Sequence, residues 1–175
     1  GQQGYAEERV PVYFHYGRIQ LSAPVMKAMK SDKGSFVRAV ESEMTGLKRD
    51  VARNYNRQRF GTSNGVVATC GTTTTSADVV LLTPSSTQLR QLEVGLVIDI
   101  GTVANPVSVA SARTITAVNT STGVVTISGA TVSTTSGAAF IFISGSGGAI
   151  GGAGQKEITG LRTIVDSSGS LFNVD

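Results

Sequence analysis

The sequence predicts an α+β fold: an extended arm, a long helix against a small β-sheet, and an inserted small all-β barrel or sandwich domain. Apolar residues recur at intervals of three or four between residues 36 and 55, which predicts one long amphipathic helix. After Phe60, Ser, Thr and Gly dominate and charge becomes sparse. Short β-type runs then recur at a spacing of about 10 to 12 residues, which is typical of small antiparallel β domains.

The N-terminal part, residues 1–33, is expected to be an arm or loop with one short helix. Residues 10–22 combine β-branched and aromatic residues with partial alternation, interrupted by Pro11 and Gly17. This pattern indicates an extended arm or an edge hairpin. Pro24 suits a first helical turn, so a short helix is expected over residues 24–30.

The long helix is expected to begin at Ser35, a suitable N-cap, and to run to about Arg59. The apolar residues at these intervals form one stripe, which is expected to pack against the rest of the domain. Leu47 and Val51 are expected to face a sheet. The predicted packing residues are Phe36, Val40, Met44, Leu47, Val51 and Tyr55. Basic residues gather in the last turns, where they suit the negative end of the helix dipole.

The β-type runs predict an inserted domain over residues 78–147, between segments that read as flexible linkers at 72–76 and 145–154. Residues 34–77 are then expected to form the long helix and the first part of a domain. Residues 148–175 are expected to form a linker and then rejoin that domain, through a strand-like run at 156–165. The expected strands are residues 79–82, 96–100, 107–109, 114–118, 124–128 and 139–144.

Catalytic and metal chemistry is poorly represented among the 175 residues. Cys70 and His15 are the single cysteine and histidine, so a disulfide framework, a multi-thiolate metal site and most histidine-based triads are excluded. Residues 61–65 fit the pattern G-x-S-x-G, but a helix precedes Ser63 and a loop follows it, which favours a turn over a nucleophile elbow. We therefore expect no enzyme activity, no catalytic or cofactor-binding residue, no cofactor and no metal.

Charge is distributed unevenly along the chain. Residues 1–60 hold 11 Lys or Arg against 6 Asp or Glu, a net +5, and the remainder carries a net −2. Arg49, Arg53 and Arg57 could face DNA weakly, although no aromatic residues are interleaved with them in the way that nucleic-acid sites favour. No apolar run is long enough to cross a bilayer and no secretory leader is present at the start, so a soluble intracellular product is expected.

Three stretches carry a resemblance to a known family. They are YFHYGRIQLS at residues 13–22, DKGSFVRA at 32–39, and NYNRQRFG at 54–61, in the order arm, long helix, following region. Together they resemble the major capsid proteins of tailed bacteriophages, the Hong Kong 97 type. The resemblance implies that residues up to about 30 form an extended loop that reaches a neighbouring subunit. It also implies that residues 34–60 form the spine helix of a peripheral domain, whose sheet residues 157–165 resume.

The resemblance further implies a structural virion protein that self-assembles into an icosahedral shell in the host bacterial cytoplasm. Its partners would be copies of itself in hexamers and pentamers, with packaged DNA touched by weak non-specific contacts at most, and with no membrane and no small-molecule substrate. The family's axial domain is missing, so the chain is expected to be a fragment. The arm residues expected to contact a neighbouring subunit are Tyr13, Phe14, Tyr16, Ile19 and Leu21.

Two other functions stay open. The Ser- and Thr-rich β domain could be an adhesin-like or carbohydrate-binding module on a helical stalk, although the absence of Trp argues against sugar stacking. The basic helix could instead bind nucleic acid through its arginines.

Overall fold

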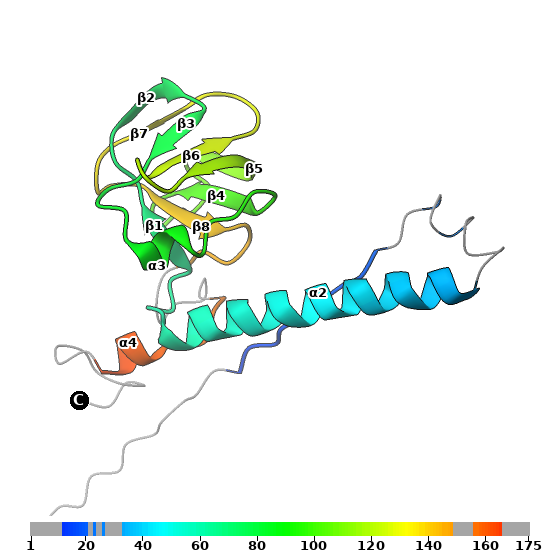
Figure 1. Ribbon diagram of the computed structural model, residues 1–175. Helices are drawn as coiled ribbons and strands as arrows, with labels where there is room; N and C mark the ends of the chain where they lie inside the picture. Colours follow the sequence, from blue (N-terminus) through cyan, green and yellow to red (C-terminus); the bar gives the residue numbers. More distant parts are fainter. Residues whose placement is uncertain (1–11, 21–22, 24–25, 27–32, 149–155, 166–175) are drawn as a thin grey trace, which may run out of the picture.

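The protein is an α+β molecule in which a β-barrel stands over the C-terminal half of one long helix (Figure 1). The computed structural model describes residues 12–20, 23, 26, 33–148 and 156–165. Ala23 and Met26 are helical, and the rest of the short helix expected at residues 24–30 lies outside the described residues.

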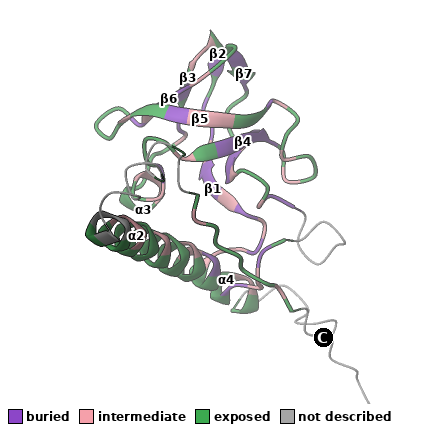
Figure 2. Ribbon diagram, turned by 90° about the vertical axis from the view of Figure 1, so that its right-hand side faces the viewer, coloured by how far each residue is buried: buried purple, intermediate pink, exposed green. Residues whose placement is uncertain are grey.

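Helix α2 spans Lys33–Phe60 and has 28 residues, so it is about 42 Å long at 1.5 Å per residue. The three-and-four spacing of its apolar residues is confirmed as helical. Figure 2 shows the helix exposed over most of its surface, with burial concentrated near its C-terminal end. There Gln58 is buried, and Arg57 and Arg59 occupy the last turn.

In the part of the chain that the structure describes, eight short strands follow α2, and six of them form one antiparallel sheet in the order β1-β8-β4-β5-β6-β3. Strands β2 and β7 pair separately. The bounds are β1 Val66–Thr69, β2 Thr73–Ser76, β3 Asp78–Val80, β4 Val97–Gly101, β5 Ala110–Asn119, β6 Val124–Ile127, β7 Val132–Thr134 and β8 Phe140–Ile143, with two short helices, α3 Ser86–Leu89 and α4 Leu161–Ile164.

The six-stranded sheet closes on itself. Cys70, just after β1, forms an antiparallel bridge with Leu81, just after β3. Gly71 donates its N–H to the carbonyl of Val80 at 2.8 Å, and Leu82 donates to the carbonyl of Thr69 at 2.9 Å. These bonds join the two outer strands, so the sheet is a small barrel.

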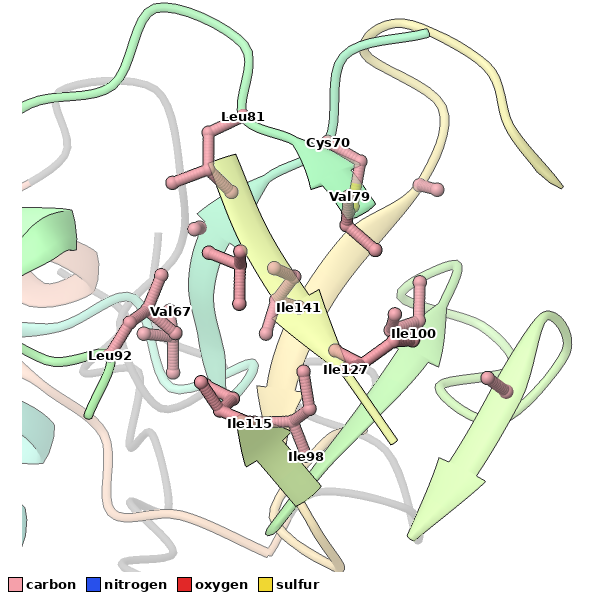
Figure 3. Close-up of a cluster of buried hydrophobic side chains, with 14 of the residues drawn as sticks. Val67, Cys70, Val79, Leu81, Leu92, Ile98, Ile100, Ile115, Ile127 and Ile141 are labelled. Carbon is pink, nitrogen blue, oxygen red and sulfur yellow. The ribbon is translucent and has the colours of Figure 1, made fainter. Parts of the chain in front are cut away.

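The barrel core is aliphatic. Figure 3 shows isoleucines from β4, β5, β6 and β8 converging with Val67, Val79 and Leu81. Ile98, Ile100, Ile115 and Ile141 are fully buried, and burial of this kind stabilises a fold by roughly 2 kcal/mol for each large aliphatic side chain. The main hydrophobic core of the described chain is therefore that of the barrel.

The barrel begins earlier than the sequence predicted. Strand β1 pairs with β8, so the predicted boundary at residue 78 is wrong and the barrel includes residues 66–77. Residues 72–76, predicted to be a linker, contain β2, which pairs with β7. Residues 107–109, predicted to be a strand, lie in the turn region before β5. Threonine-rich strands lack the apolar alternation on which the prediction relied.

The chain after the barrel also differs from expectation. Residues 156–160 are irregular and α4 follows, so the predicted strand at 156–165 is wrong. Gly160 precedes the first turn of α4, and its backbone lies against the carbonyls of Gln58 and Gly61. Within the residues that the structure describes, every sheet belongs to the barrel, and the separate small sheet expected beside the long helix is not found.

The two ends of the barrel lie side by side, as an insertion requires. Gly148 donates its N–H to the carbonyl of Asn64 at 3.3 Å. A Cβ at Gly65 would lie 2.7 Å from the carbonyl oxygen of Ser146, so these two chain segments approach as closely as glycine allows. Within the described residues, the barrel therefore joins the rest of the chain where residues 61–65 meet residues 145–148 and 156–160.

Candidate functional site

The described residues hold no obvious catalytic centre. No group of three His, Cys, Asp or Glu in this part of the chain could hold a metal ion. Burial raises the pKa of the Cys70 thiol to about 12, so the thiol is not an activated nucleophile. His15 lies on the arm with its ring edge-on to Tyr55, the centroids 6.1 Å apart, which is a packing contact.

Ser63 has a structural role. It is buried and has a left-handed backbone, with φ at 66°. Its Oγ accepts a hydrogen bond from the N–H of Gly160 at 2.9 Å and shares another with Thr163 Oγ1 at 3.2 Å. Ser63 thus ties the chain that enters the barrel to the chain that leaves it, in agreement with its interpretation as a turn residue.

Asp99 is a buried carboxylate that sequence reasoning missed. One oxygen, Oδ1, accepts from the N–H of Ala112 at 2.7 Å and from Ser144 Oγ at 3.1 Å. The other accepts from the N–H of Gly145 at 2.8 Å. Both oxygens are satisfied by neighbouring strands and turns, so Asp99 holds β4, β5 and β8 in place.

The apolar stripe of α2 is largely uncovered. Met44, Val51 and Tyr55, predicted to pack the helix, are exposed, as is Val37. Val40 and Leu47 are half-buried, and the side chain of Phe36 lies outside the described residues. Val51 packs against no sheet of a separate domain within the described residues, where every sheet lies in the barrel domain.

The arm, residues 12–20, runs alongside α2 (blue in Figure 1). A Cβ at Gly17 would lie 2.6 Å from Leu47 Cδ1, so the arm backbone lies directly on that leucine. Phe14 and Tyr16 have ring centroids 6.3 Å apart and are 74% and 87% exposed. Tyr13 and Ile19 are half-buried, and Leu21 lies outside the described residues.

A cleft of about 510 Å³ lies between the arm, α2 and the barrel. Apolar side chains contribute much of its wall, and Arg53 and Glu93 cross it. The aliphatic residues that line it are Leu47, Val51, Val94, Leu96 and Ile143. We call the exposed stripe of α2, the arm and this cleft together the helix–arm surface.

Arg53 does not present a free charge to DNA. Its Nη1 donates to Glu93 Oε2 at 2.8 Å, its Nη2 pairs with the other oxygen of Glu93, and the same nitrogen donates to the carbonyl of Arg90 at 3.1 Å. Arg53, predicted to face DNA, is therefore held in an ion pair with Glu93. Its charge is compensated within the chain.

Arg57 is even less available. Its guanidinium forms a two-bond ion pair with Glu157, one bond being 3.1 Å, and donates to Asn54 Oδ1 at 2.9 Å. The two charged side chains are only 8% and 3% exposed. Arg57 joins α2 to the chain beyond the barrel. Of the three arginines predicted to face DNA, Arg49 is exposed and has no ion pair with another described residue.

Sequence reasoning could not have found Glu93 and Glu157. Each is an isolated acid, 40 and 100 residues from its arginine. The sequence offers only the arginines at the end of a helix, and these suit the helix dipole as well as an ion pair.

Every helix in the described part of the chain is too short or too polar to cross a bilayer. No protein-family model, curated protein or solved structure matches the chain. Among the described residues, the helix–arm surface is the feature whose apolar side chains most lack a partner.

Proposed function

We propose that this protein is a shell subunit, a major capsid protein of the tailed-phage type, whose partners are copies of itself. The observation that carries the proposal is the helix–arm surface, on which aromatic and aliphatic side chains of the arm and α2 remain exposed along a 28-residue helix. The resemblance of residues 13–22, 32–39 and 54–61 to the family supports the same assignment.

Burial of this surface would stabilise an assembly. Monomeric soluble proteins rarely expose a continuous apolar patch larger than a few hundred Å². The exposed residues here are Phe14, Tyr16, Val37, Met44, Val51 and Tyr55. Aromatic residues and methionine are enriched at the centres of protein interfaces, where they fill pockets and exclude water.

The position of the barrel is compatible with assembly. Because it is attached through one junction, it adds a domain without interrupting either the arm or α2. The ion-paired states of Arg53 and Arg57 favour a protein partner over DNA, since their charges are already neutralised. Any contact with packaged DNA would then be weak and non-specific.

The test is assembly of the chain carrying Phe14→Ala and Tyr16→Ala. Both side chains are mostly exposed, so the melting temperature of the monomer should stay unchanged while higher oligomers are lost. Sedimentation velocity and electron microscopy measure the assemblies. Val107→Ala is the matched control, because Val107 is an exposed valine on the barrel.

Normal assembly of the double variant would contradict the proposal, and so would an equal loss in the Val107 control. A wild-type chain that stays monomeric at every concentration, also when expressed within a longer protein, would contradict it as well.

A further inference from the structure

Two attachments hold the barrel on α2. The first is the junction formed by the described residues 61–65, 145–148 and 156–160. The second is the ion pair between Arg53 of α2 and Glu93, which lies between α3 and β4. The carbonyl of Arg90 accepts a further hydrogen bond from the Arg53 guanidinium at 3.1 Å.

Little apolar packing holds the barrel between these attachments. The cleft of about 510 Å³ separates Leu47 and Val51 on the helix from Val94 and Leu96 on the barrel side. Helix α2 makes no extensive contact with any described strand. The tilt of the barrel relative to the helix therefore depends on polar contacts more than on a packed interface.

The junction contains two glycines with left-handed backbones. Gly65 and Gly145 have φ values of 75° and 79°, in the region that glycine adopts most easily. The entering and leaving segments lie side by side, joined by the bond between Gly148 and Asn64. Two adjacent glycine-containing segments at one end of a rigid barrel have the construction of a hinge.

We propose that the Arg53–Glu93 pair is a latch that fixes the tilt of the barrel on α2, and that the barrel pivots about the junction when the pair is broken. The Arg53 guanidinium donates two hydrogen bonds to the Glu93 carboxylate and a third to the carbonyl of Arg90. Together these bonds fix the orientation of the barrel as well as its distance from the helix. The side chains are 41% and 59% exposed, so salt screens the latch. This inference goes beyond the proposed function and does not require assembly.

The experiment measures a distance within the unassembled chain. Lys48→Cys on α2 and Thr120→Cys on the turn after β5 place spin labels at exposed positions on the two bodies. Cys70 is fully buried and should stay unlabelled. Pulsed electron resonance at low salt should give one narrow distance distribution for this pair, and Arg53→Ala should shift and broaden it.

Arg49→Ala is the matched control, since Arg49 is an exposed arginine one turn away on the same helix, and it should leave the distribution unchanged. The double variant Arg53→Glu with Glu93→Arg should restore the narrow distribution, and 1 M salt should broaden that of the labelled parent chain. An unchanged distribution in Arg53→Ala would overturn the latch, as would a broad distribution in the parent chain at low salt. Both outcomes are independent of whether shells form.

Discussion

Gly160 donates its backbone N–H to the hydroxyl oxygen of Ser63 at 2.9 Å, in a buried contact that spans 97 residues of chain. This bond brings the chain that leaves the barrel back to the chain that enters it. It also explains why a serine occupies a left-handed position where glycine would be less strained.

Ser63→Ala should destabilise the protein by about 1 to 3 kcal/mol, because the buried N–H of Gly160 loses its acceptor. Chemical denaturation followed by circular dichroism measures the change. Ser121→Ala, at an exposed turn residue of the barrel, is the control and should change stability by less than about 0.5 kcal/mol. An unchanged free energy of unfolding in Ser63→Ala would show that this contact does not hold the junction.

Glu157→Gln should cost about 3 kcal/mol or more, because it leaves the buried Arg57 guanidinium without a compensating charge. Arg53→Ala at the exposed pair should cost at most about 1 kcal/mol, since water and salt screen that pair. The free energy of unfolding of both variants is the measurement. Equal costs would mean that burial does not distinguish the two pairs.

A fragment of residues 64–148 should fold alone, whereas residues 78–147 should not. The shorter fragment lacks β1 and β2, so β8 loses its neighbour and the bridge between Cys70 and Leu81 cannot form. Thermal melting and the dispersion of amide resonances compare the two fragments. A cooperative melt of the shorter one would show that β1 is dispensable to the barrel.

Gly17→Ala should release the arm from α2, because a Cβ there would lie 2.6 Å from Leu47 Cδ1. Hydrogen exchange should become faster across residues 12–20 and stay unchanged in the barrel. Gly46→Ala is the control, since nothing lies within 4 Å of a Cβ at that helical position. Unchanged exchange of the arm would indicate that Leu47 moves aside to accept the methyl group.

Cys70 should resist alkylation at pH 8 in the native protein and react at an ordinary rate in denaturant. Its folded pKa is raised from 9.0 to about 12 by burial, so the unfolded thiol ionises first as pH rises. Stability should therefore decrease between pH 9.0 and about 12, and the decrease should be smaller in Cys70→Ala. Rapid alkylation of the native chain would contradict the burial.

The long helix could be predicted from sequence because a periodicity sustained from residue 36 to 55 has one structural solution. The stripe could not reveal its partner, however, since periodicity shows which face is apolar and not what covers it. Strands β4, β5 and β8 were predicted from their Val, Ile and Phe residues. Strands β1, β2 and β7 were not predicted. The threonines and serines of β2 and β7 satisfy a β-ladder with little apolar signal, whereas β1 carries the apolar run at residues 66–68 and was not recognised as a strand.

The arginines show the same limit at the candidate site. A sequence shows that Arg53 and Arg57 are basic and helical, but only the fold brings Glu93 and Glu157 to them. The sequence could not show that the charges of these two arginines are already paired, because the partner acids are remote in sequence. Within the described residues, Arg49 forms no ion pair with an acid.

The junction has a mechanical consequence. Because Asn64 and Gly148 are hydrogen-bonded neighbours, a pulling force applied to the two sides of the chain acts across that bond and is not transmitted along the strands between them. The contacts that bear the load are those of Ser63 with Gly160 and of Arg57 with Glu157. The barrel would stay folded under tension until these contacts rupture, so the chain resists stretching at its junction and keeps its barrel outside the path of the force.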